Sequence, residues 1–117
     1  MTHGKDVQDA LRPHARALRQ KIPEVYRGFG ELHGAAFADG ALPTRTKELI
    51  AFAISVSQQC DGCIAAHARS AVRAGVSPEE AAEAIGVSIV MSGGPATVYG
   101  PRAYAAFMEY HEEAHQG

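Results

Sequence analysis

The chain has 117 residues, of which 46% are hydrophobic and 21% are charged, and its formal net charge is −2. This length and composition are typical of a single globular domain with one modest core. The near-neutral charge, the absence of tryptophan and an aromatic content of 7% exclude the basic, base-stacking surface of nucleic-acid-binding proteins.

Three helices are predicted in the first half of the chain from their start and stop signals. The first two span residues 6–20 and 23–37 and are separated by the Ile22-Pro23 step. The third begins with Thr44 as its expected N-cap and continues to residue 59. Because residues 49–56 are apolar on almost all sides, we expect this helix to be central and buried.

Three further helices are predicted over residues 60–74, 78–91 and 95–112. Ser77 is followed by proline and, three positions on, by glutamate, which is the pattern of a capping box. A Gly-Pro step at residues 100–101 is expected to kink the last helix. No segment alternates in hydrophobicity as a strand does, so we predict an all-α fold of five or six helices, with the whole chain as one domain.

The stretch CDGCIAAH holds the only two cysteines, Cys60 and Cys63, followed by His67. At about 100° per residue these side chains share one face of a helix, with the cysteine Cα atoms about 5–6 Å apart. A helix start favours the thiolate form of cysteine, and a histidine one turn away can accept the proton. A redox-active pair is therefore favoured over a metal site, which would lack a fourth ligand, and over inert buried thiols.

Other features bear on the compartment in which these thiols work. The N-terminal residues are polar, and the longest apolar run, residues 49–54, is too short to cross a bilayer. We therefore expect a cytoplasmic protein, in a compartment that keeps thiols reduced. A disulfide across so short a loop would add only about 2 kcal/mol of stability, so a purely structural role is not expected.

The stretch from LPTRTKELIAFAIS to GGPATVYG resembles the AhpD-like alkylhydroperoxidase branch of the carboxymuconolactone decarboxylase superfamily. The signature of that branch is Glu, eleven residues, Cys-x-x-Cys, three residues, His. Glu48, Cys60, Cys63 and His67 match it without a gap, and the similarity covers roughly residues 30–110. The resemblance implies an all-helical fold in which the helix that begins at the cysteines faces the helix that carries Glu48.

The resemblance also implies roles. Cys63 would attack a hydroperoxide, Cys60 would resolve the sulfenic acid into a disulfide, and His67 with Glu48 would relay the proton. An external dithiol, a lipoylated protein in the characterised peroxidase, would return the electrons, with no further cofactor, in a homotrimer or homohexamer. Gly62 stands where that peroxidase has histidine. A thiol–disulfide oxidoreductase without peroxide activity, and a redox sensor or oligomeric scaffold, therefore remain alternatives.

Four weaker patterns have simpler interpretations. The sequence HEEAH at residues 111–115 matches a zinc-protease motif but is interpreted as a solvated helix end. Residues 92–95, SGGP, are interpreted as a helix break rather than a phosphate loop. The aromatic residues of the last helix are expected in the core or in a subunit interface: Tyr99, Tyr104, Phe107 and Tyr110. Three scattered histidines are expected on or near the surface: His3, His14 and His33.

Overall fold

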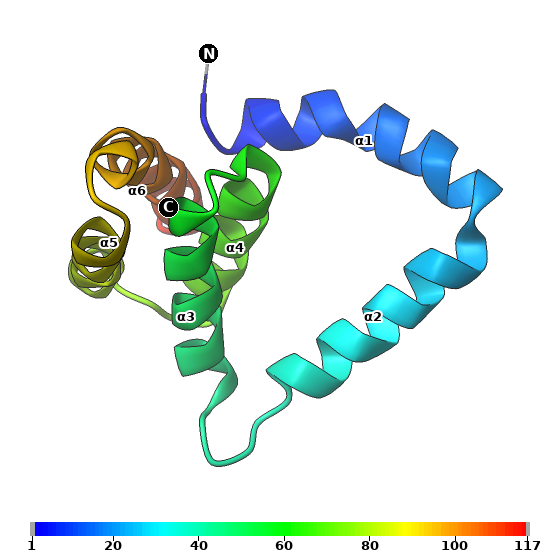
Figure 1. The fold of residues 1–117 in the computed structure, drawn as a ribbon, viewed down its shortest axis with the longest axis horizontal. Coiled ribbons are helices and arrows are strands. Elements are labelled where there is room, and N and C mark those ends of the chain that lie inside the picture. Colours follow the sequence, from blue (N-terminus) through cyan, green and yellow to red (C-terminus); the bar gives the residue numbers. More distant parts are fainter. Residues whose placement is uncertain (1, 117) are drawn as a thin grey trace.

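A computed structural model describes residues 2–116 and contains six α-helices (Figure 1). The helices are α1 (Lys5–Lys21), α2 (Pro23–Phe37), α3 (Thr44–Ser57), α4 (Asp61–Arg73), α5 (Pro78–Ser92) and α6 (Gly94–Ala114). Each lies within two residues of its predicted position, and the described residues contain no strand. The all-α prediction is therefore confirmed.

The four helices α3 to α6 pack together around a common core. The largest fully buried side chains come from α3, α4 and α6: Phe52, Val56, Ile64 and Phe107. The rings of Phe52 and Phe107 meet at a tilt, with centroids 6.0 Å apart. Many of the remaining core positions hold alanine, which lets neighbouring helices approach closely. This bundle gives the first turn of α4 a rigid support.

The first two helices extend from the bundle as an arm, which forms two sides of an open triangle with α3 as its third side (Figure 1). The N-terminal part of the arm is attached through Glu109, whose carboxylate accepts the Lys5 amide at 2.7 Å, and through Tyr110, whose hydroxyl donates to Gln8. Every residue of α2 keeps part of its surface exposed. One apolar face of the arm is open: Leu18, Ile22, Val25, Phe29 and Leu32.

The prediction that the third helix is central and buried was wrong for one of its sides, although Phe52 and Val56 are buried. Ile50 and Ile54, one turn apart on α3, are 44% and 49% exposed. The helix packs against the bundle through its buried residues, which include Phe52 and Val56, and α2 diverges from α3 along its length (Figure 1). An apolar stripe therefore remains on the outer side of this helix.

Thr44 does not act as the predicted N-cap of α3, because Pro43 occupies that position. The Thr44 amide instead donates to the Asp39 carboxylate at 2.7 Å, and its hydroxyl donates to the Phe37 carbonyl at 2.7 Å. These bonds tie the end of α2 to the start of α3. The hydrogen bond from the Thr44 amide holds the pKa of Asp39 below its ordinary value.

The start of α5 follows the prediction. Ser77 Oγ accepts from the Glu80 amide at 3.2 Å, and the Glu80 carboxylate accepts from the Ser77 amide at 2.9 Å. After Gly93, whose φ is 71°, α6 begins and continues through Pro101 without interruption. Gly100 is buried where α6 meets α5, and a Cβ there would lie 2.8 Å from Ile85 Cγ2.

The aromatic residues of α6 mostly face the core, as expected. Phe107 and Tyr110 are buried and Tyr99 packs against the core, whereas Tyr104 is 39% exposed. At the end of α6, His115 Nδ1 lies 2.7 Å from the His111 carbonyl oxygen. None of the helices described is both long and apolar enough to cross a membrane.

Candidate functional site

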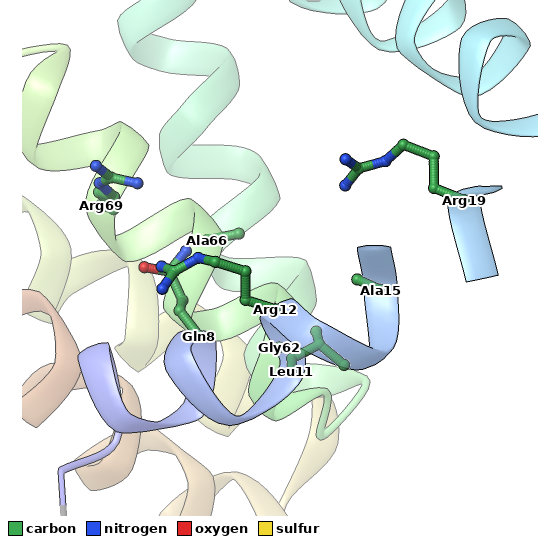
Figure 2. Close-up of a pocket in the computed structure, with 8 residues that line it drawn as sticks. All are labelled: Gln8, Leu11, Arg12, Ala15, Arg19, Gly62, Ala66 and Arg69. Atoms are coloured by element: carbon green, nitrogen blue, oxygen red, sulfur yellow. The ribbon is translucent and has the colours of Figure 1, made fainter. Parts of the chain in front are cut away.

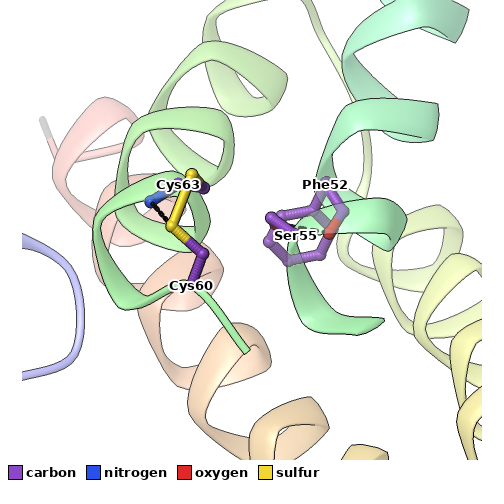
Figure 3. The surroundings of a disulfide bond; sticks show 4 residues. All are labelled: Phe52, Ser55, Cys60 and Cys63. Atoms are coloured by element: carbon purple, nitrogen blue, oxygen red, sulfur yellow. Dashed lines mark hydrogen bonds between the residues drawn. A yellow bond between two sulfur atoms is a disulfide. The ribbon is translucent and has the colours of Figure 1, made fainter. Parts of the chain in front are cut away.

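The two cysteines form a disulfide at the start of α4 (Figure 3). Their Cα atoms are 5.2 Å apart, within the range expected from helix geometry. Cys60 is the N-cap of α4 in an extended conformation, and its Sγ accepts a hydrogen bond from the Cys63 amide at 3.3 Å. Both residues are partly buried, so each keeps part of its surface exposed.

The connection between α3 and α4 fixes the position of Cys60. Gln59 adopts a φ of 55°, in the left-handed region, and this turn lets the Cys60 amide donate to the Ser55 carbonyl at 3.2 Å. Ser55 and Phe52 lie on the neighbouring α3 (Figure 3). Because Cys60 is also the helix N-cap, the first-turn amides and the helix dipole favour negative charge on its sulfur.

Glu48 and His67 meet between α3 and α4. The Glu48 carboxylate is buried, with 5% of the residue exposed, and its Oε2 lies 3.0 Å from His67 Nδ1. A carboxylate only accepts hydrogen bonds, so Nδ1 is the ring nitrogen that donates in this pair, and Nε2 is the nitrogen that does not contact Glu48. The 20% exposure of the His67 side chain leaves the ring accessible. The arrangement can therefore orient a histidine to exchange protons.

The sequence predictions grouped Glu48, Cys60, Cys63 and His67, and the structure places all four on facing parts of α3 and α4. Their individual roles in a reaction stay a prediction. Within residues 2–116, no three or more histidine, cysteine, aspartate or glutamate side chains are grouped as metal ligands.

Two residues of α2 that the sequence analysis did not assign to the site lie against His67. The Phe37 ring is nearly parallel to the His67 ring at 5.6 Å between centroids, and His33 stacks on Phe37 at 4.3 Å. His33 had been interpreted only as a surface or partly buried histidine. The spacing of His33 and Phe37, one helical turn apart, was a visible signal. Their direction toward His67 depends on the path of the arm, which sequence patterns do not report.

The sequence profile of the carboxymuconolactone decarboxylase family matches residues 23–107, a range that includes all four predicted site residues. The chain belongs to the carboxymuconolactone decarboxylase family. A solved structure gives the same fold: the apo form of a carboxymuconolactone decarboxylase family protein from Legionella pneumophila has a TM-score of 0.87 and is 37% identical. That match covers 92% of this chain and 96% of the Legionella chain.

Two curated proteins are also similar to this chain. An uncharacterized protein of Cupriavidus necator is 40% identical over 91 residues, which cover 78% of this chain and 80% of the relative. The uncharacterized protein 4 in the cox locus of Paracoccus denitrificans is 42% identical over 81 residues, which cover 69% of this chain and 73% of the relative. The cysteine pair of this family member fits the AhpD-like branch, as the sequence analysis expected.

Proposed function

We propose that this family member is a thiol oxidoreductase that reduces hydroperoxides through its cysteine pair. The observation that carries the proposal is the Cys60–Cys63 disulfide at the start of α4, in the same pair of helices as the Glu48–His67 hydrogen bond. The two thiols supply two electrons when they are oxidised to the disulfide, and an oriented histidine supplies a proton acceptor. Membership of the family adds support for thiol chemistry of this kind.

In the proposed reaction, the Cys63 thiolate attacks one oxygen of the hydroperoxide, and the O–O bond breaks. The products are a sulfenic acid on Cys63 and an alcohol, which receives the proton that His67 took from the thiol. Cys60 then attacks the sulfenic sulfur and releases water as the disulfide forms. The balance is one hydroperoxide and two thiols converted to one alcohol, one water and one disulfide. An external dithiol or a lipoylated protein reduces the disulfide in a second exchange.

The resemblance to the AhpD-like branch assigns Cys60 as the resolving residue, and the N-cap position of Cys60 bears on the second step. The Cys63 amide, 3.3 Å from Cys60 Sγ, would also stabilise a thiolate there in the reduced protein. A resolving cysteine that is already ionised condenses quickly with a sulfenic acid, which limits further oxidation. The same contact would stabilise the Cys60 thiolate when an external thiol attacks Cys63 and breaks the disulfide.

We also propose that the protein works in the cytoplasm as a homotrimer or homohexamer. Apolar side chains remain exposed on the outer side of the bundle as well as on the arm: Ile50, Ile54, Val87, Val90 and Met91. Val90 and Met91 are 83% and 78% exposed. Single exposed apolar residues are common on monomers, but groups at helical spacing on several helices are typical of subunit interfaces.

A thiol titration with hydroperoxide tests the reaction. The reduced protein should lose two thiols per hydroperoxide consumed, Cys63→Ser should abolish this loss, and Cys60→Ser should leave a sulfenic acid that dimedone can trap. Thiols that stay reduced in excess hydroperoxide would contradict the proposal. In that event, catalytic reduction of model disulfides would identify a thiol–disulfide oxidoreductase, the alternative favoured by Gly62. Oxidation without turnover by any dithiol would instead indicate a redox sensor.

A further inference from the structure

A groove of about 260 Å³ lies between α1 and α4 (Figure 2), and Gly62, the residue before Cys63, is part of its lining. Three arginines line it, Arg12 and Arg19 from α1 and Arg69 from α4. The formal charge of the whole chain is −2, so this concentration of positive charge does not follow from a basic composition. A local cluster of this kind indicates attraction for an anion.

The floor of the groove is continuous with the disulfide loop. Gly62, which lies between the two cysteines, lines the groove together with Ala66 and Arg69. These three residues are four and three positions apart, so they share one face of α4, and Cys63 lies about 100° further round the same turn. Gly62 has no side chain, and the Leu11 side chain lies beside it, with Leu11 Cδ2 3.6 Å from the position that a Cβ would occupy.

The arginines keep most of their charge available to a ligand. Arg12 pairs with Asp9 at 2.9 Å, in an exposed contact that solvent weakens. Arg19 lies over the Tyr26 ring, 5.6 Å from its centroid, which orients the guanidinium without neutralising it. Arg69 forms no ion pair with any residue in the described part of the chain. Two guanidinium groups from α1 and one from α4 thus line the same space.

We propose that this groove binds the carboxylate of the small molecule that exchanges electrons with the Cys60–Cys63 disulfide. The planar guanidinium donates two parallel hydrogen bonds to a carboxylate, which positions the ligand as well as attracting it. The inference rests on the proposed thiol chemistry and adds a substrate class. The carboxylate belongs either to a dithiol that reduces the disulfide and becomes a disulfide itself, or to a hydroperoxide that oxidises the two thiols and leaves as an alcohol.

Two matched pairs of reagents separate these sources. In one arm, dihydrolipoate and dihydrolipoamide, which share a dithiol and differ only in carboxylate or amide, reduce the oxidised protein. In the other, a hydroperoxy fatty acid and its methyl ester oxidise the reduced protein. The carboxylate reagent should react about 3- to 10-fold faster at low ionic strength in at least one arm, and the preference should fall as salt is added.

The variant Arg69→Gln should abolish the carboxylate preference, so that the two members of each pair react at equal rates. Arg27→Gln, on the exposed surface of α2, is the matched control, because it removes the same charge and should retain the preference. Equal rates for both members of each pair, or a preference that persists in Arg69→Gln, would overturn the groove assignment alone. If no dithiol reduces the disulfide and no hydroperoxide oxidises the thiols, the proposed function fails as well.

Discussion

The hydrogen bond between Glu48 and His67 provides the sharpest test of the candidate site. Replacing Glu48 with glutamine keeps the shape of the side chain but removes its charge. Glutamine can donate as well as accept, so the protonated Nδ1 tautomer of His67 would no longer be enforced. In the buried setting of Glu48, 5% exposed, solvent cannot restore the lost interaction.

The size of the effect follows from the type of bond. A hydrogen bond to a charged group contributes about 1.5–3 kcal/mol. If the proton transfer to His67 depends on this bond, the barrier should rise by that amount, and the rate of thiol oxidation should fall by about 10- to 150-fold, since 1.36 kcal/mol is tenfold. The His67→Gln variant should show a similar loss, and the double variant should lose little more, because the two residues act as a unit.

The assay is the rate at which the reduced protein loses free thiols after mixing with hydroperoxide, together with thermal unfolding of each variant. Glu79→Gln, an exposed first-turn glutamate of α5, is the matched control and should react at the wild-type rate. A wild-type rate in Glu48→Gln, with the fold intact, would refute the proton relay. The thermal unfolding curves separate a loss of activity from a loss of structure, because a variant that unfolds at a lower temperature than the wild type is not counted as evidence for the relay.

Three further predictions concern the fold and its assembly. Gly100→Ala places a Cβ 2.8 Å from a side chain of α5 and should lower the free energy of urea unfolding by about 1–3 kcal/mol. Gly30→Ala meets nothing within 4 Å and should raise that free energy by about 0.5–1 kcal/mol. Equal effects of the two variants would contradict the packing at the α5–α6 contact. The hydrogen bond from the Ser77 amide, and secondarily Arg45, lower the pKa of Glu80 below its ordinary value of 4.5. The ionised Glu80 carboxylate should therefore stabilise the fold fully above pH 4.5, and this contribution should vanish as the pH falls through the lowered pKa. Unfolding of Glu80→Gln should therefore differ from wild type at pH 7 and converge with it once the pH is below the lowered pKa of Glu80. In sedimentation, Val90→Glu should reduce the mass of the assembly while Glu83→Lys should not, and a monomeric wild type would show that assembly was wrongly proposed.

Local signals in the sequence were enough to place the helices and the cysteine site. Proline at residue 23, the Ser77 capping box and the glycine at residue 93 mark helix ends through short-range bonding, which does not depend on the rest of the fold. The distance between the cysteine Cα atoms likewise follows from their separation of three residues.

Contacts between distant helices could not be predicted in this way. The hydrophobic pattern of residues 49–56 shows that α3 is apolar but not which neighbours cover it, so the exposure of Ile50 and Ile54 was missed. Two features depend on the direction in which the arm leaves and rejoins the bundle. One is the stacking of Phe37 on His67, and the other is that Arg12 and Arg69 line the same groove. That direction is set by tertiary contacts and not by local propensity.

The arm links these separate features. It carries Phe37 and His33 against the ring that Glu48 orients, and it carries Arg12 and Arg19 to one side of the groove beside the cysteines. Yet α2 makes few contacts with the bundle and keeps its apolar face open. A segment held by few buried contacts is easily displaced. A second copy of the chain, or any other contact that covers the apolar face of the arm, would therefore hold the arm in place. It would fix the position of Phe37 and His33 beside His67 and the position of Arg12 and Arg19 in the groove at the same time. Assembly and thiol chemistry should then respond together to a single substitution on that face.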